Sequence, residues 1–127
     1  MNTRITSEAD LKSVSSLLHD ARFTVNAIEF DSASHTFVLT CWVLESRQEG
    51  SVASRYWKGC RLSFANVSDC KLNIREAVSY YELATIRLVA RDQKLDFVTH
   101  YGIDISLIIG ELDGTLEKTN ETRERWN

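Results

Sequence analysis

Two histidines and an aspartate are the residues of this sequence best suited to proton transfer. His19 and Asp20 are adjacent and follow an apolar stretch, whereas His100 lies far along the chain between Thr99 and Tyr101. A carboxylate that hydrogen-bonds an imidazole fixes the tautomer and orientation of the ring, as in hydrolytic dyads and triads. One interpretation is therefore a small-molecule-binding or hydrolytic domain with a pocket between helix and sheet near these three residues.

A structural role is the alternative for the same residues. A histidine just past the end of a helix interacts favourably with the negative end of the helix dipole, and no neighbouring residue supplies a third catalytic group. The histidines, His19, His35 and His100, also lack the HxH or HxxxH spacing typical of zinc ligands. The sequence therefore predicts no metal site and no cofactor.

A second set of candidates combines acidic and aromatic side chains. Carboxylates gather in the C-terminal third, without the apolar setting that would separate the pKa values of a general acid and base. Tyrosine and tryptophan are favoured as anchors at protein interfaces. We therefore predict a protein-binding surface rather than a catalytic pair, with these candidate residues: Trp57, Tyr56, Asp104, Glu111, Asp113 and Glu117.

The segment Glu111-Leu-Asp113-Gly114-Thr resembles the D-x-D-G-T motif of haloacid-dehalogenase-type phosphatases. The resemblance implies that Glu111 would be the nucleophile and Asp113 the general acid and base. Glutamate is one methylene longer than the family's aspartate, and a misplacement of about 1 Å can cost a hundredfold in rate. We instead expect an Asp113–Gly114 hairpin turn that joins strands at 103–112 and 115–118.

Composition restricts the broad class. With 127 residues, 43% of them hydrophobic and 26% charged, the chain is expected to form a single domain over residues 1–127. No apolar run approaches the ~18 residues of a membrane span, and the N-terminal residues lack a signal-peptide core, so a cytoplasmic location is expected. The net charge of −3, without a basic cluster, argues against nucleic acid or membranes as partners.

The three cysteines are expected to be reduced. Their odd number would leave one thiol unpaired in an oxidising compartment, and they form no CxxC motif. Cys41 and Cys60 lie in apolar patterns typical of core residues, whereas Cys70 lies in a polar segment. We expect Cys70 to be the exposed thiol.

Hydrophobic periodicity predicts one helix and several strands. Ser7 is a candidate N-cap, and Leu11, Val14, Leu17 and Leu18 form an apolar stripe on a helix over residues 8–18. Residues 36–44 are apolar on both faces, as in a central strand. Residues 45–54 are polar and are expected to form a loop. The first predicted strand covers 22–30, where a phase slip in the apolar alternation suggests a bulge near Asn26 or Ala27, and it is expected to form an antiparallel hairpin with the strand at 36–45. Further strands are predicted at 55–66, 81–90, 95–101, 103–112 and 115–118, followed by a polar tail at 119–127.

These elements indicate an α+β fold that is mainly antiparallel β, either a sandwich or a strongly curved sheet with the N-terminal amphipathic helix packed on it. One choice stays open, because residues 74–90 also fit a helical stripe. Alternation in the segments on either side of residues 91–94 favours a hairpin and hence a strand.

Three segments carry a family resemblance: the helix that leads into Leu18-His19-Asp20-Ala21, the hairpin strand at 28–31, and Leu62-Ser-Phe-Ala-Asn-Val67. Together they resemble small uncharacterised bacterial β-rich proteins, some of them grouped with toxin-immunity proteins. The resemblance implies a bacterial protein that is not an enzyme and acts by binding. The leading expectation is thus a small cytoplasmic protein-binding domain. More specifically, it would be an immunity-type inhibitor or an accessory protein. A homodimer through an exposed sheet edge is a further expectation.

Overall fold

The structure is a computed structural model that describes residues 2–50 and 52–124. Mostly antiparallel strands form one sheet, and the α-helix of the described residues packs on it, which confirms the predicted α+β, mainly antiparallel class. The strands are joined in the order β1-β10-β5-β4-β2-β7-β8-β9-β6, and β3 pairs with β4. The elements are β1 (Asn2–Ile5), α1 (Glu8–Leu17), β2 (Arg22–Phe23), β3 (Ile28–Asp31), β4 (Thr36–Glu49), β5 (Val52–Phe64), β6 (Val67–Ile74), β7 (Tyr81–Val89), β8 (Lys94–Thr99), β9 (Ile103–Ile109) and β10 (Gly114–Arg123).

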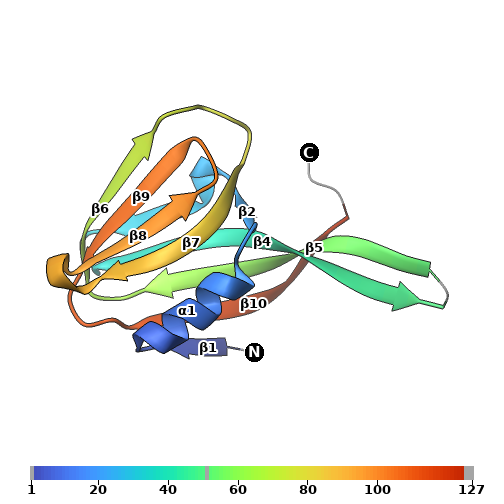
Figure 1. Cartoon of the computed structure of the whole chain (residues 1–127), viewed down its shortest axis with the longest axis horizontal. Coiled ribbons are helices and arrows are strands. Elements are labelled where there is room, and N and C mark those ends of the chain that lie inside the picture. Colours follow the sequence, from blue (N-terminus) through green and yellow to red (C-terminus); the bar gives the residue numbers. More distant parts are fainter. Residues whose placement is uncertain (1, 51, 125–127) are drawn as a thin grey trace.

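The sheet folds over on itself, so that its two halves face each other (Figure 1). The short strand β2 joins the halves, because Arg22 pairs with Trp42 of β4 on one side and with Glu82 of β7 on the other. Aromatic side chains from the two halves meet inside. The ring of Phe97 in β8 lies 5.3 Å from Phe37 and 6.1 Å from Phe64, measured between ring centroids.

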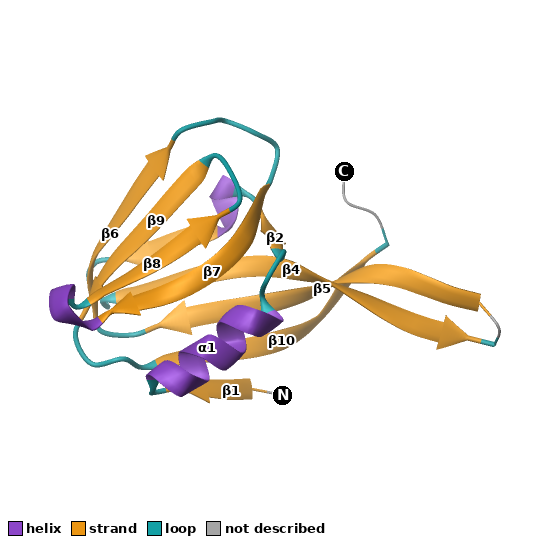
Figure 2. Ribbon diagram, viewed as in Figure 1, coloured by secondary structure: helices purple, strands orange, loops and turns teal. Residues whose placement is uncertain are grey.

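Helix α1 begins at its predicted N-cap and packs against β7 and β1 (Figure 2). The Ser7 hydroxyl accepts a hydrogen bond from the Asp10 amide at 3.1 Å. The predicted stripe is only partly right, because Leu17 is 56% exposed while Ser15 is buried. The Ser15 hydroxyl is paired with Thr85 at 3.0 Å and accepts from the Ile86 amide at 2.9 Å, which satisfies the buried group.

Two sequence predictions about the sheet are confirmed. The stretch at 36–44 is a middle strand, since β4 pairs with β5 along one edge and with β2 and β3 along the other. Residues 81–89 form a strand rather than a helix, and β7 pairs with β8 as the predicted hairpin.

The predicted single strand at 22–30 is wrong. Strand β2 ends at Phe23, and a 3-10 turn at Val25–Ala27 replaces the expected bulge before β3 begins. Residues 28–31 then complete the expected hairpin with β4. The phase slip in the apolar pattern therefore marked a break between two strands.

The predicted loop at 45–54 is wrong as well. Strands β4 and β5 stay paired from Phe37 with Phe64 out to Glu49 with Val52, so only residues 50 and 51 separate them. The distal part of this hairpin extends beyond the rest of the sheet (Figure 1). We call it the β4–β5 arm and define it as residues 45–50 and 52–56.

The Asp113–Gly114 hairpin does not form either. Strand β9 pairs with β6 and β8, whereas β10 pairs with β1 and β5, so the intervening residues cross from one half of the sheet to the other. Gly114 is required by packing, since a Cβ atom there would lie 2.6 Å from the Phe64 ring.

Two strands and one extension were not expected from the sequence. Strands β1 and β6 were missed, and β10 continues to Arg123 instead of ending near residue 118. The rest of the predicted tail, residues 125–127, lies outside the described residues.

Within residues 2–50 and 52–124, no helix has the length and apolar character needed to cross a membrane.

Candidate functional site

The structure brings His19, Asp20 and His100 together, and we call these three residues the His–Asp–His cluster. His19 and Asp20 follow α1, and His100 lies in the turn between β8 and β9. The Nε2 atom of His100 lies 2.7 Å from Asp20 Oδ1, and Nε2 of His19 lies 3.5 Å from the same oxygen. All three side chains are exposed, at 56%, 62% and 39%. The cluster is thus accessible to solutes.

Three consecutive carbonyl groups of β7 hold the cluster in place. The Glu82 carbonyl accepts from the His100 amide at 3.0 Å, and the Leu83 carbonyl accepts from the Asp20 amide at 2.7 Å. The Ala84 carbonyl lies 2.8 Å from Nδ1 of the His19 ring. Strand β7 thereby fixes the backbone at two cluster residues and the ring of the third.

A bulge in β7 contributes to this arrangement. The pairing of β7 with β8 shifts register between Leu83 and Thr85, so Ala84 is the extra residue. Such bulges redirect backbone and side-chain groups and occur often beside functional sites. Ala84 was not among the residues expected at the site, although the sequence carries a signal for the bulge. The buried residues of β7 are Tyr81, Leu83 and Ile86, so their spacing changes from two to three.

The hydrogen bond to Ala84 fixes the tautomer of His19. A carbonyl oxygen can only accept, so Nδ1 of His19 must carry the hydrogen. In the neutral ring, Nε2 then carries a lone pair, and this atom is the one nearest Asp20. Asp20 itself adopts a left-handed backbone with φ of 68°, which aspartate tolerates better than most residues.

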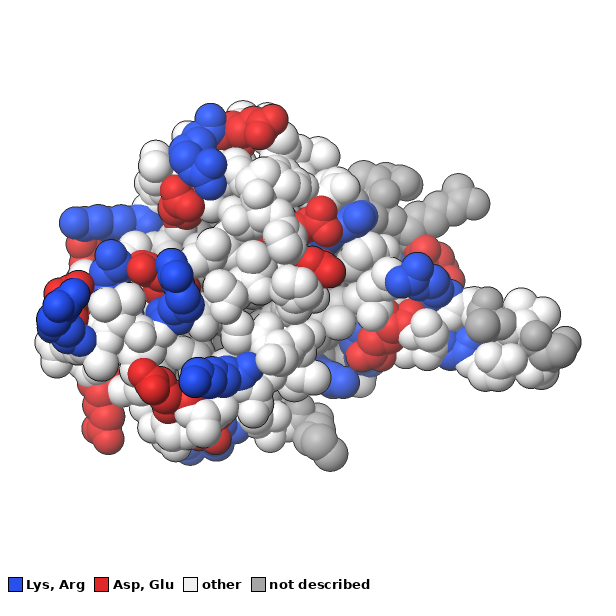
Figure 3. Space-filling view, viewed as in Figure 1, with Lys and Arg blue, Asp and Glu red and all other residues white. Residues whose placement is uncertain are grey.

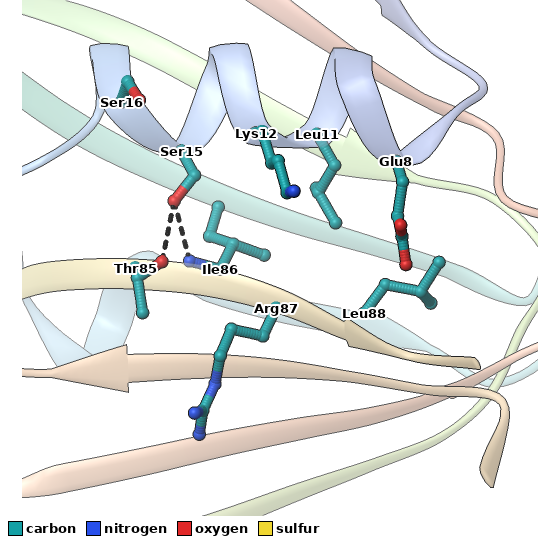
Figure 4. Close-up of a pocket in the computed structure, with 9 residues that line it drawn as sticks. All are labelled: Glu8, Leu11, Lys12, Ser15, Ser16, Thr85, Ile86, Arg87 and Leu88. Carbon is teal, nitrogen blue, oxygen red and sulfur yellow. Dashed lines mark hydrogen bonds between the residues drawn. The ribbon is translucent and has the colours of Figure 1, made fainter. Parts of the chain in front are cut away.

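A groove between α1 and β7 leads to the cluster. It consists of two adjoining hollows of about 480 and 340 Å³ that share Ser15, Ser16 and Thr85, and His19 lines the smaller one. Figure 4 shows the larger hollow, with the Ser15 hydroxyl turned toward β7 and bonded there. Ser15 thus links helix to sheet, and its hydroxyl is already engaged.

Two of the four predicted carboxylates are engaged in ion pairs with arginines. Asp113 pairs with Arg4 at 3.1 Å, and Asp104 pairs with Arg75 at 2.9 Å. Asp104 lies near the start of β9 and Glu111 follows its end, about 20 Å away at ~3.3 Å per strand residue. Acidic and basic side chains alternate over the face in Figure 3. Protein binding by Glu111, Asp113, Asp104 and Glu117 stays a prediction.

The two predicted aromatic anchors lie at the base of the β4–β5 arm. Trp57 is only 8% exposed, and the Arg22 guanidinium lies 4.6 Å from the centre of its ring. Tyr56 is half-buried and donates a hydrogen bond to Glu45 at 3.0 Å, while Arg47 covers its ring. Both side chains therefore contact partners within the chain.

The three cysteine thiols are buried or half-buried in this fold. Cys41 and Cys60 are buried opposite each other on β4 and β5, and burial raises the pKa of both thiols. Cys70 is half-buried rather than exposed, and burial raises its pKa also. Less thiolate at neutral pH means weaker nucleophiles and metal ligands.

The chain was compared with protein-family models, curated proteins and solved structures, and none of the three comparisons gave a match.

Proposed function

We propose that this protein binds a partner protein through the outer edge of β4 in the arm, where an extended segment of the partner adds as a further strand. One observation carries the proposal. Strand β4 continues to Glu49, yet among residues 2–50 and 52–124 no strand pairs with its outer edge beyond Trp42. An unpaired strand edge is a template for pairing with another chain.

The backbone of this edge has a defined pattern. Glu49 and Val52 flank a two-residue loop, so their backbone groups face each other across the hairpin. Backbone groups alternate in direction along an antiparallel strand. Those of Gln48 and Ser46 consequently point outward, toward the position that a partner strand would occupy.

The side chains beside this edge indicate what the partner segment offers. Leu44 is half-buried on the face of β4 that it shares with Trp42, whose ring is already covered by Arg123. Farther out, Ser46 and Gln48 follow on the same face and are exposed. An added strand with apolar residues near the base of the arm and polar residues near its tip would match this surface. The family resemblance favours one partner of this kind, a toxin that an immunity-type inhibitor recognises.

A pair of proline variants tests the proposal. Proline removes a backbone N–H, so Ser46→Pro removes a donor from the outer edge of β4. Residue 55 pairs directly with residue 46, so Arg55→Pro removes the corresponding donor on the opposite edge of the hairpin and is a matched control. Wild-type protein and both variants would be used as bait in extracts of the source cells, with stoichiometry measured by mass spectrometry.

The expected result is a stoichiometric protein captured by the wild type and by Arg55→Pro but lost with Ser46→Pro. Capture that survives Ser46→Pro, or no stoichiometric capture, would contradict the proposal. A homodimer that Ser46→Pro dissociates would also contradict it, because the edge would then serve a second copy.

A second candidate function is small-molecule binding, which the His–Asp–His cluster at the end of the α1–β7 groove favours. Inorganic phosphate is a suitable first probe, because His19 and Lys12 line the groove. Binding there should shift the ring signals of His19 and His100 in NMR spectra and leave those of His35 unchanged. Equal shifts at all three rings would count against this candidate.

A further inference from the structure

We propose that the His–Asp–His cluster is a binding site for zinc or another late first-row divalent transition-metal ion. The proposal goes beyond partner binding by the arm and is independent of it. One ligand atom from each of the three residues lies within 4.8 Å of the other two. Two imidazoles and one carboxylate form a ligand set that such ions take in proteins, with further positions left to solvent or an exogenous ligand.

The orientation of His19 fits a metal ligand. Its Nδ1 donates to the Ala84 carbonyl, which leaves Nε2 as the coordinating atom on the side of Asp20. Metal-ligating histidines almost always donate their other ring N–H to a carbonyl or carboxylate in this way.

Two of the three distances between ligand atoms are close to those of a zinc site, and the third, between the two imidazole nitrogens and within 4.8 Å, has to shorten. Two ligands about 2.05 Å from a tetrahedral zinc ion lie ~3.3 Å apart. The distances from Asp20 Oδ1 to Nε2 of His100 and of His19, 2.7 and 3.5 Å, fall on either side of this value. Exposed side chains can change these distances by rotating about their χ angles, while the β7 carbonyls keep the backbone in place.

The nature of the ligands selects the class of ion. Imidazole nitrogen suits zinc, copper and nickel, whereas magnesium and calcium prefer sites made of oxygen ligands. The cluster supplies two nitrogens and one carboxylate. It should therefore discriminate strongly against magnesium and calcium.

The spacing of the histidines in the sequence concealed this arrangement. His19 and His100 are brought together because both segments hydrogen-bond to neighbouring residues of β7. Short motifs such as HxxxH detect ligands on one helix or strand, and here the ligands come from two separate turns.

The test uses the full chain without a histidine tag, after treatment with a chelator. Cobalt(II) binding would be followed by visible absorption and zinc binding by calorimetry, with magnesium as a negative control. Asp20→Asn and His100→Ala remove one ligand each, and asparagine also tolerates the left-handed backbone at residue 20. His35→Asn is the matched control, because His35 is exposed and has φ of 56°.

We expect one zinc or cobalt ion per chain, no magnesium binding, and affinity at least about tenfold weaker in both Asp20→Asn and His100→Ala. His35→Asn should bind as the wild type does, and circular dichroism would establish that each variant is folded. Absence of zinc and cobalt binding by the wild type would overturn the proposal. Equal affinity in the wild type and the two ligand variants would overturn it as well.

Discussion

Strands β4 and β5 run through two regions of the molecule that differ in what surrounds them. Within the folded-over sheet, Leu39 of β4 pairs with Leu62 of β5, and both side chains are completely buried. In the arm, Arg47 pairs with Ser54 in the same continuous register, and Arg47 is exposed. The pairing between β4 and β5 is the same in both regions, whereas side-chain burial changes, and so does the pairing at the outer edge of β4.

Backbone pairing between two strands can therefore extend a hairpin beyond the hydrophobic core of the domain. The arm is supported at its base by side-chain contacts: Arg47 pairs with Glu124 at 2.7 Å and covers the Tyr56 ring, and Lys118 pairs with Glu45 at 3.3 Å. Exposed ion pairs of this kind contribute little to stability. The arm can therefore expose a strand edge without weakening the core of the domain.

The largest effect is expected from a core residue that joins the two halves of the sheet. Phe97→Ala would remove contacts with Phe37 and Phe64 and leave a cavity, at a cost of ~3–5 kcal/mol in the free energy of unfolding. Urea denaturation would measure it. A loss below about 1 kcal/mol would mean that the halves do not share one core.

An intermediate effect is expected where β10 approaches β5. Gly114→Ala would place a methyl group against the buried Phe64 ring and should destabilise by ~1–3 kcal/mol. The same urea titration applies, with Gly110→Ala as the control, because a Cβ at residue 110 would make only ordinary contacts with Asn66. Equal effects of the two substitutions would contradict the packing role of Gly114.

The smallest effect is expected in the arm. Arg47→Ala removes the exposed ion pair with Glu124, and the expected loss is about 0–1 kcal/mol. Thermal unfolding of the variant should nearly coincide with that of the wild type. A loss comparable to that of Phe97→Ala would show that the arm is part of the core.

The parts of the fold that could be predicted are those in which burial produces a regular spacing of apolar residues along the sequence. Residues 36–44 were placed in the middle of the sheet because both faces are apolar, and α1 was located by its N-cap. The arm was missed because a hairpin exposed on both faces has no apolar periodicity to detect. Strand β6 was missed for a similar reason, since it lies at a sheet edge and most of its side chains are exposed.

The candidate site was predictable only in part. His19, Asp20 and His100 stood out by residue type, but the contacts that join them depend on the backbone of β7, which side-chain patterns do not reveal. At Asp113–Gly114 the sequence predicted a hairpin turn that the structure does not form. A strong local hairpin signal was overridden by tertiary packing, because Gly114 is needed beside Phe64.

The central claim, that among residues 2–50 and 52–124 no strand pairs with the outer edge of β4 in the arm, is tested most directly by amide hydrogen exchange followed by NMR in the isolated protein. Amides of residues 37–41 should exchange slowest, because they open only with the core. In the arm, Arg47 should show some protection, whereas Ser46 and Gln48 should exchange at rates close to those of an unstructured peptide. Protection of Ser46 and Gln48 equal to that of residues 37–41 would contradict the account.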